Sequence, residues 1–415
     1  MEWGRKIVGM ICFTCMTLLF IQSNATTFLH VPDHIVLFES EWENEDIIHE
    51  KLAMDKEGNI ETDEEAETVS VKISPLPEKK TNVTKIPDIK VIPGGDSIGV
   101  QLESHGVMVI GFHEIKEGEK RFSPAKKAGL EIGDRIVQIN QKKINSLDDV
   151  VDVLEETTSE SVTVHIERGN KQKEIEVSIH KGKDGNIIGA YIRQSASGVG
   201  TLTFYEPKTG KFGALGHVIA DPDTKDPIEI SEGKIMRSTV NDIEKGINGT
   251  PGEKRATIIP EKETLGKVTK NSPFGVFGVL DEEKLQQNKI TKKALPIAFA
   301  DEVKKGPAQL WTVVEGEKIE AFDIEIVQTV PQMERATKGM VIEVTDEKLI
   351  EKTGGIIQGM SGSPIIQDGK LVGAVTHVFV NEAKTGYASH IEWMLEEAGI
   401  NTYKEERTKD KKTAS

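Results

Sequence analysis

Most of the chain consists of short hydrophobic runs that are broken by glycine and by charged residues, and this pattern predicts many β-strands and few helices. The run "SVTVHIER" is followed by Gly169-Asn170 and "KEIEVSI", which predicts a hairpin. A second hairpin is predicted at Asp368-Gly369, a favoured two-residue turn between "PII" and a strand that ends at Val380. The pattern therefore favours a mainly β fold with some α.

Composition fits this picture and narrows the function. Aromatic residues make up 5% of the 415 residues, whereas glycine occurs 38 times, a mixture that suits β-rich folds with many turns. The net charge of −16 argues against a nucleic-acid binder. Cys12 and Cys15 are the only cysteines, so the rest of the chain has no disulfide framework, no thiolate metal site and no cysteine nucleophile. The sequence predicts neither a metal site nor a cofactor.

The N-terminus carries the pattern of an export signal. Arg5 and Lys6 precede a hydrophobic run of 15 residues from Ile7 to Ile21. This run is shorter than the roughly 20 residues of a full membrane span. The small residues of "SNA" at 23–25 are suited to cleavage. We expect residues 1–25 to be a signal anchor that attaches the protein to a membrane, or a removed signal peptide, and the remainder to be extracytoplasmic.

Two segments are predicted to have little fixed structure. Residues 26–90 are dense in acid, as in "ESEWENEDIIHE", and are predicted to be an acidic flexible linker with one or two short strands. Residues 403–415 read as a charged tail. Two globular blocks remain between them, at 91–182 and 186–402.

The first block resembles a PDZ domain. "SPAKKAGL" reads as a short helix that ends at Gly129, and Ser146 reads as the cap of a helix over 147–156. The resemblance is carried by "AKKAGLEIGDRIVQIN", Ala125 to Asn140. It implies that an extended peptide binds as an added strand, unless the groove is filled by the chain itself or unused. The loop expected to hold the peptide carboxylate is "SIGV", that is, Ser97, Ile98, Gly99 and Val100.

The second block contains "QGMSGSP", in which glycines flank Ser361 on both sides. Glycine permits backbone conformations that turn several N–H groups toward one point, as an oxyanion hole requires. If Ser361 is a nucleophile, the candidates for the oxyanion hole are, by analogy with similar loops, the N–H groups of Gly359 and Ser361. Ser363 is the less favoured nucleophile because Pro364 follows it directly, and a plain turn is the non-catalytic alternative.

A serine nucleophile needs a base, and His217 is the candidate. It lies in "KFGALGHVIAD", between glycines and a hydrophobic run, where a histidine buried in the core is the alternative interpretation. His377 follows the serine hairpin too closely to be an equally simple partner, and we expect it to be structural.

"FGALGHVI" and "TGGIIQGMSGSPIIQDGKLVGAVTHVF" together closely resemble the SpoIVB peptidase family, PDZ-containing serine peptidases of sporulation. The resemblance implies a PDZ domain followed by a trypsin-like double β-barrel peptidase domain, with Ser361 as nucleophile and His217 as base. By the same resemblance the acidic member of the triad is Asp346, which could alternatively cap the short helix "EKLIEK". Asp221 and Asp323 are the other candidates for this acidic member.

The resemblance also implies a role. The expected enzyme is a serine endopeptidase at the forespore membrane, facing the intermembrane space, that cleaves its own N-terminal region. It is expected to cleave the regulatory subunit of an intramembrane metalloprotease complex, which can then process the late mother-cell sigma factor. The alternatives are a non-catalytic PDZ signalling scaffold and an HtrA-like quality-control protease.

Overall fold

The computed structural model describes residues 26–54, 59–74, 76–117, 120–169, 171–182, 185–258, 264–284, 290–291, 293–330 and 335–403. The chain forms two compact units, residues 1–89 with 401–415 and residues 90–400. The expected signal anchor at 1–25 and nearly all of the charged tail lie outside the described residues. No helix in the described ranges is long and apolar enough to cross a membrane.

The first unit corrects the prediction of a flexible linker at 26–90. It contains a four-stranded sheet in the order β1-β4-β3-β2 and a helix with a common hydrophobic core. Leu37, Ile48 and Val69 of this core are fully buried. The acidic side chains are mostly on the surface, so their density hid the alternating strands "HIVLF" and "TVSVK". The elements are β1 (His34–Phe38), η1 (Glu39–Glu41), α2 (Glu45–Lys51), β2 (Asn59–Asp63), β3 (Thr68–Lys72) and β4 (Lys79–Ile86).

The second unit begins with a six-stranded barrel. Its strands pair in the closed ring β6-β17-β19-β20-β16-β15, and β15 returns to β6. Alternating hydrophobic residues fill its interior, among them Ile98, Val100, Phe212 and Val276. The barrel strands are β6 (Ser97–Phe112), β15 (Ala190–Tyr205), β16 (Lys211–Ala214), β17 (Ile230–Glu244), β19 (Thr264–Ser272) and β20 (Gly275–Leu280). Around them lie β5 (Lys90–Pro93), β18 (Glu253–Ile258), η2 (Glu282–Lys284) and β21 (Leu295–Pro296).

A second closed barrel follows, in the strand order β22-β23-β24-β27-β26-β25. The predicted turn between β25 and β26 is confirmed, with φ of 50° at Asp368 and 76° at Gly369. Two six-stranded barrels are the arrangement expected of a trypsin-like peptidase, so this part of the fold prediction is confirmed. The elements are β22 (Gly306–Val313), β23 (Ile319–Thr329), β24 (Met340–Val344), α5 (Glu347–Thr353), β25 (Pro364–Gln367), β26 (Lys370–Phe379), β27 (Glu382–His390) and α6 (Ile391–Glu397).

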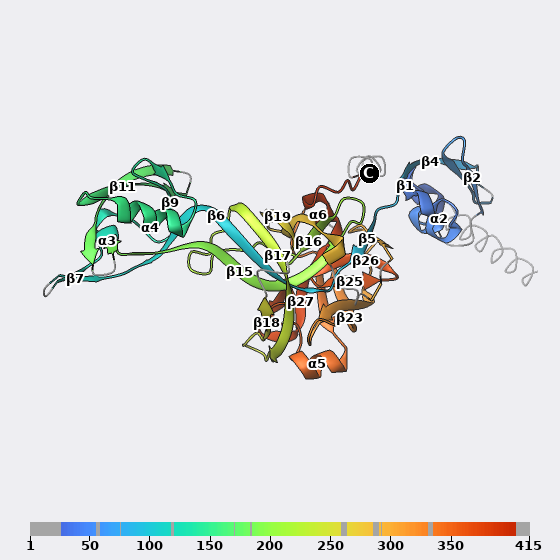
Figure 1. Ribbon diagram of the computed structural model, residues 1–415. Helices are drawn as coiled ribbons and strands as arrows, with labels where there is room; N and C mark the ends of the chain where they lie inside the picture. Colours follow the sequence, from blue (N-terminus) through green and yellow to red (C-terminus); the bar gives the residue numbers. More distant parts are fainter. Residues whose placement is uncertain are drawn as a thin grey trace, which may run out of the picture. The chain divides into compact units, whose positions relative to one another are not determined.

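The PDZ domain does not precede the first barrel but is inserted into it. The long strands β6 and β15 belong to the barrel at one end and to the PDZ domain at the other (Figure 1). Both predicted helices are present: Gly129 ends the first with φ of 100°, and Ser146 caps the second. The remaining elements are β7 (Ile115–Glu117), β8 (Lys120–Phe122), α3 (Pro124–Ala128), β9 (Arg135–Ile139), β10 (Lys142–Lys143), α4 (Leu147–Glu156), β11 (Ser161–Arg168), β12 (Lys171–Ser178), β13 (His180–Gly182) and β14 (Gly185–Ile187).

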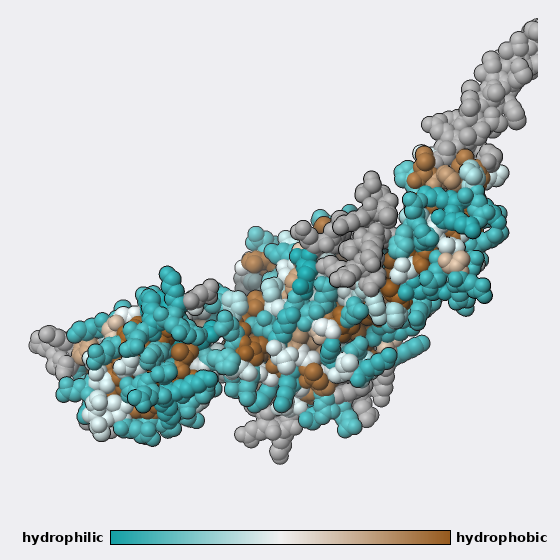
Figure 2. All heavy atoms as spheres, turned by 90° about the horizontal axis from the view of Figure 1, so that it is seen from above, coloured by the Kyte–Doolittle hydropathy of each residue, from teal (hydrophilic) through white to brown (hydrophobic). Residues whose placement is uncertain are grey.

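The prediction that Ser97 to Val100 form a carboxylate-binding loop is therefore wrong. These residues begin β6 and are buried in the first barrel, where β15 pairs with one edge and β17 with the other. A Cβ at Gly99 would lie 2.6 Å from a methyl group of Ile258. In the described structure both edges of this segment are thus occupied by strands, which leaves neither edge open to a peptide. The face in Figure 2 is mostly hydrophilic, with hydrophobic residues in small groups, as expected when the barrels bury their hydrophobic side chains.

Candidate active site

The loop that carries Ser361 is pressed against the first barrel. Gly359 and Gly362 have φ of 90° and 91°, which disfavours any other residue. A Cβ at Gly362 would lie 2.2 Å from the carbonyl oxygen of Thr201 on β15 and 2.4 Å from the backbone nitrogen of Leu215. The glycines thus let the nucleophile loop of the second barrel meet the first barrel backbone to backbone.

The two serines of this loop have different surroundings. Ser361 is partly exposed, and its Oγ donates a hydrogen bond to the Thr376 carbonyl over 3.0 Å. Ser363 is fully buried, and its Oγ donates to Thr312 Oγ1 over 3.0 Å. Only Ser361 is accessible to a substrate, which supports Ser361 over Ser363 as the nucleophile.

His217 comes to the same place from the first barrel. It follows β16 through Leu215 and Gly216, both in left-handed backbone conformations. A Cβ at Gly216 would lie 3.0 Å from the carbonyl oxygen of Val375 on β26. Strand β26 also provides the Thr376 carbonyl that accepts from Ser361. The turns after β16 and before β25 therefore bring His217 and Ser361 to the same stretch of β26, although 144 positions separate them in the sequence.

The hydrogen bond of the imidazole suits a general base. His217 Nδ1 lies 2.9 Å from the carbonyl oxygen of Val218. A carbonyl can only accept, so in the neutral imidazole Nδ1 carries the hydrogen and Nε2 keeps its lone pair. Within the described chain no hydrogen bond joins His217 to Ser361. The Ser361 hydroxyl must therefore turn from the Thr376 carbonyl to the imidazole before it can transfer its proton.

His377 is closer to the site than the sequence indicated. Its ring centroid lies 5.5 Å from that of His217. Burial lowers the pKa of His377, and the neighbouring His217 and Lys338 lower it further. An uncharged imidazole beside His217 does not repel the positive charge that His217 acquires during proton transfer. The signal in the sequence was the return of the predicted hairpin toward Ser361.

The geometry also supports the predicted oxyanion hole. The N–H groups of Gly359 and Ser361 have no hydrogen-bond partner among the residues that the structure describes. The carbonyl of Gln358, which shares a peptide group with the Gly359 N–H, accepts from the backbone of Lys254 over 2.9 Å. Two unpaired N–H groups on either side of Met360 can stabilise a negatively charged oxygen.

Asp346 does not contact His217 in this structure. Its carboxylate caps α5, with Oδ1 accepting from the Leu349 N–H over 2.9 Å. The other oxygen accepts from the backbone N–H of Asp323 over 3.4 Å. The cap that the sequence offered as the alternative is thus the role the structure shows. No described carboxylate orients His217, since the Val218 carbonyl occupies Nδ1.

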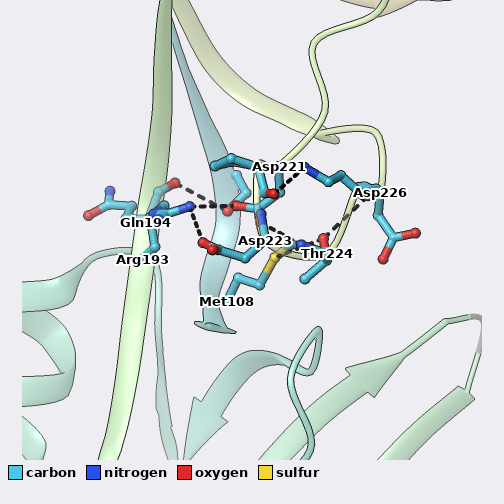
Figure 3. A network of polar contacts seen from close by, with 10 residues as sticks. Met108, Arg193, Gln194, Asp221, Asp223, Thr224 and Asp226 are labelled. Carbon is cyan, nitrogen blue, oxygen red and sulfur yellow. Dashed lines mark hydrogen bonds and ion pairs between the residues drawn. The ribbon is translucent and has the colours of Figure 1, made fainter. Parts of the chain in front are cut away.

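Asp221 instead fixes the turn that follows His217. One carboxylate oxygen accepts from the N–H groups of Asp223 and Thr224, over 2.9 and 3.0 Å. Figure 3 shows Arg193 of β15 reaching both Asp221 and Asp223, at 3.1 and 2.8 Å. Burial acts to raise the pKa of Asp221, but these hydrogen bonds and the arginine lower it overall. The same turn touches the PDZ part of β6, where Thr224 Oγ1 lies 3.8 Å from Met108 Sδ.

Comparisons with known proteins divide the chain in the same way. A family model described as SpoIVB peptidase S55 matches residues 184–395, and a PDZ domain model matches 117–168. A putative zinc metalloprotease of Staphylococcus aureus (strain N315) is 43% identical over 58 residues, and the match spans only 14% of each chain.

Two solved structures are also similar to parts of the chain. The Rv3671c protease of M. tuberculosis, in its active form, is 16% identical, covers 50% of this chain and 76% of its own, and has a TM-score of 0.27. The PDZ domain of an SdrC-like protein from Listeria monocytogenes is 22% identical, covers 21% of this chain and 87% of its own, and has a TM-score of 0.18.

The S55 match covers about half of the chain. It includes both the turn that carries His217 and the loop that carries Ser361. With two closed barrels, an accessible serine and a histidine meeting on β26, the chain belongs to the SpoIVB peptidase S55 family, a family of serine peptidases.

Proposed function

We propose that the protein is a serine endopeptidase in which Ser361 attacks the substrate carbonyl and His217 accepts the serine proton. The observation that carries this proposal is the meeting of two loops from different barrels on β26, beside two unpaired N–H groups. Each group has the chemistry that the step requires.

The reaction would proceed in two halves. The Ser361 oxygen forms a bond to the carbonyl carbon while Nε2 of His217 takes the proton, and the carbonyl oxygen becomes an oxyanion between the N–H groups of Gly359 and Ser361. Collapse of this intermediate breaks the C–N bond, and the imidazolium returns the proton to the leaving amine. Water then hydrolyses the acyl-enzyme by the same route. The uncharged His377 nearby avoids repulsion of the transient imidazolium.

The biological role that we propose is a checkpoint in sporulation. The enzyme would act from the forespore membrane in the intermembrane space, cleave its own N-terminal region, and cleave the regulatory subunit of an intramembrane metalloprotease complex. Processing of the late mother-cell sigma factor would follow. Family membership supports this role. A scaffold without catalysis and an HtrA-like quality-control protease are the competing functions.

The PDZ domain would present the substrate, but by a different edge from the one expected. Residues 190–193 of β15 pair with β6 on one side, and no strand in the described ranges covers the other side. Helix α4 lies against β14 and β15. Exposed hydrophobic residues lie on these neighbouring elements: Leu147, Val151, Ile187 and Tyr191. An open edge beside a partly hydrophobic helix suits an extended peptide that is added as a strand.

One experiment separates the enzyme from the scaffold. The full chain and its Ser361→Ala variant are incubated with fluorescein-labelled casein and with a fluorophosphonate probe, and self-cleavage is followed by gel. We expect hydrolysis, labelling and fragments cut before about residue 91 from the parent, and none of the three from Ser361→Ala. Ser197→Ala, at an exposed serine of β15, is the matched control and should behave like the parent. Equal activity of parent and Ser361→Ala would refute the proposal.

A further inference from the structure

Lys254 of β18 is an unusual residue to find in the interior. Its side chain is 2% exposed, and its Nζ donates a hydrogen bond to Thr312 Oγ1 over 2.8 Å. No carboxylate in the described part of the chain forms an ion pair with it. The folded protein would be more stable with a hydrophobic side chain at this position than with an amine that lacks a counter-charge. Packing alone therefore does not explain a lysine here.

The main chain of Lys254 forms a hydrogen bond with the peptide group between Gln358 and Gly359, two residues before Ser361. Its N–H donates to the Gln358 carbonyl over 2.9 Å, and the Gln358 N–H donates to Gly252 over 2.8 Å. A trans peptide group directs its C=O and N–H to opposite sides. With the Gln358 carbonyl fixed toward β18, the Gly359 N–H is turned away from β18, and it has no hydrogen-bond partner among the described residues.

The side chain of Lys254 packs directly against the same glycine, Gly359. A Cβ at Gly359 would lie 3.0 to 3.2 Å from three carbons of the lysine chain, so the chain runs directly beneath it. At its end, Thr312 Oγ1 accepts from both Lys254 Nζ and Ser363 Oγ. Thr201 Oγ1 lies 3.4 Å from Ser363 Oγ and donates to the Gly359 carbonyl over 2.9 Å. A continuous chain of polar contacts thus runs from the amine to the other side of Gly359.

The charge state of the amine is set by its surroundings. Burial lowers the pKa of Lys254 to about 7, with no opposing contribution from an acid. The neighbouring charged residues, Glu253 and Arg255 on β18 and Asp242 and Glu244 on β17, are all exposed. Glu244 pairs with Arg255 over 2.6 Å. Across from Lys254, β17 presents Ile243. The amine donates to the hydroxyl of Thr312, and within the described residues no acid lies beside it to balance the charge of an ammonium.

We propose that Lys254 is a positioning residue for the oxyanion hole: its main chain and its buried amine together hold the Gly359 peptide with the N–H group directed into the site. The inference rests on the proposed peptidase function. It predicts that loss of the amine weakens transition-state stabilisation and leaves substrate binding nearly unchanged.

Kinetics on the full chain test this proposal. Hydrolysis of fluorescein-labelled casein is measured for the parent, Lys254→Met, and Lys234→Met as a matched control at an exposed lysine of β17. For Lys254→Met we expect kcat to fall about 10²-fold with KM within about threefold, because a displaced oxyanion donor acts in the transition state. Lys234→Met should match the parent.

The outcomes are distinguishable. If the parent hydrolyses casein no faster than Ser361→Ala, the peptidase proposal fails and this inference fails with it. If the parent is active and Lys254→Met keeps its kcat, only the inference is wrong. Should Lys254→Met not fold, Thr312→Val removes the acceptor of the amine, and a kcat within twofold of the parent would overturn the proposal. Hydrogen exchange gives a readout without catalysis: peptides covering 356–363 should exchange faster in Lys254→Met, and unchanged exchange would count against it.

Discussion

Replacing Lys254 by methionine should make the protein more stable at neutral pH, and the gain should vanish as the solution becomes alkaline. In the folded protein burial lowers the pKa of Lys254 to about 7, whereas 10.5 is its ordinary value. Below about pH 7 the amine is protonated in both the folded and the unfolded chain, so the folded protein bears the whole unfavourable free energy of a buried charge. Between pH 7 and 10.5 only the unfolded chain holds the proton.

The size of the effect follows from proton linkage. Across this window the free energy of unfolding of the parent should rise by about 1.4 kcal/mol for each pH unit relative to a chain that lacks the group. The free energy of unfolding of Lys254→Met, in which the buried charge is absent, should therefore exceed that of the parent most at and below pH 7. Its advantage should shrink by about 4 kcal/mol between pH 7 and 10.

Urea unfolding at pH 6.5, 7.5, 8.5 and 9.5 provides the assay. The fluorescence of Trp311 and Trp393, both buried in the second barrel region, reports the transition. Lys234→Met serves as the reference, because it removes an exposed lysine and should track the parent at every pH. Parallel curves for Lys254→Met and the parent, or a methionine variant that is less stable at pH 7, would refute the argument that an uncompensated charge lies under the nucleophile loop.

Three further predictions concern the site. Ser361→Ala should abolish hydrolysis with little change in stability. Ser363→Ala should lower the free energy of unfolding by about 1 kcal/mol and should lower kcat without abolishing hydrolysis, because it interrupts the polar contacts between Lys254 and Gly359. Urea unfolding and casein hydrolysis measure both variants, and loss of hydrolysis in Ser363→Ala alone would move the nucleophile to Ser363. Asp346→Ala should lower the free energy of unfolding by about 1 kcal/mol, because it removes the cap of α5. Asp346→Asn should keep both stability and activity, because Asn caps a helix equally well. A 10⁴-fold loss of kcat in Asp346→Asn would instead make Asp346 a member of the triad. Arg193→Met should speed hydrogen exchange of the turn at 217–226 and lower kcat, because it removes the ion pairs to Asp221 and Asp223. The control Lys142→Met, at an exposed ion pair of the PDZ domain, should do neither. Equal hydrogen exchange in the two variants would refute the role of the Arg193 contacts.

Local chemistry was sufficient to predict much of this protein from its sequence. The turn at Asp368-Gly369 and the helix caps at Ser146 and Gly129 depend on the conformations of a few neighbouring residues, and all are present. Glycines around Ser361 indicated a loop of special backbone conformation for the same reason. Hydrophobic alternation likewise indicated strands, and the motif around Ser361 indicated the peptidase family.

Pairing between distant strands was decided only by the tertiary structure. "SIGV" reads equally well as a PDZ loop or as a strand, because its hydrogen-bond partners, β15 and β17, lie about 100 or more residues away. The insertion of the PDZ domain into the first barrel is a consequence of these pairings. Lys254 shows the same limit more sharply: in the sequence it is one of many lysines between charged neighbours, and only the packing of β18 beneath Gly359 removes it from water. A side chain's burial and charge state depend on which distant segments enclose it, and the local pattern does not contain that information.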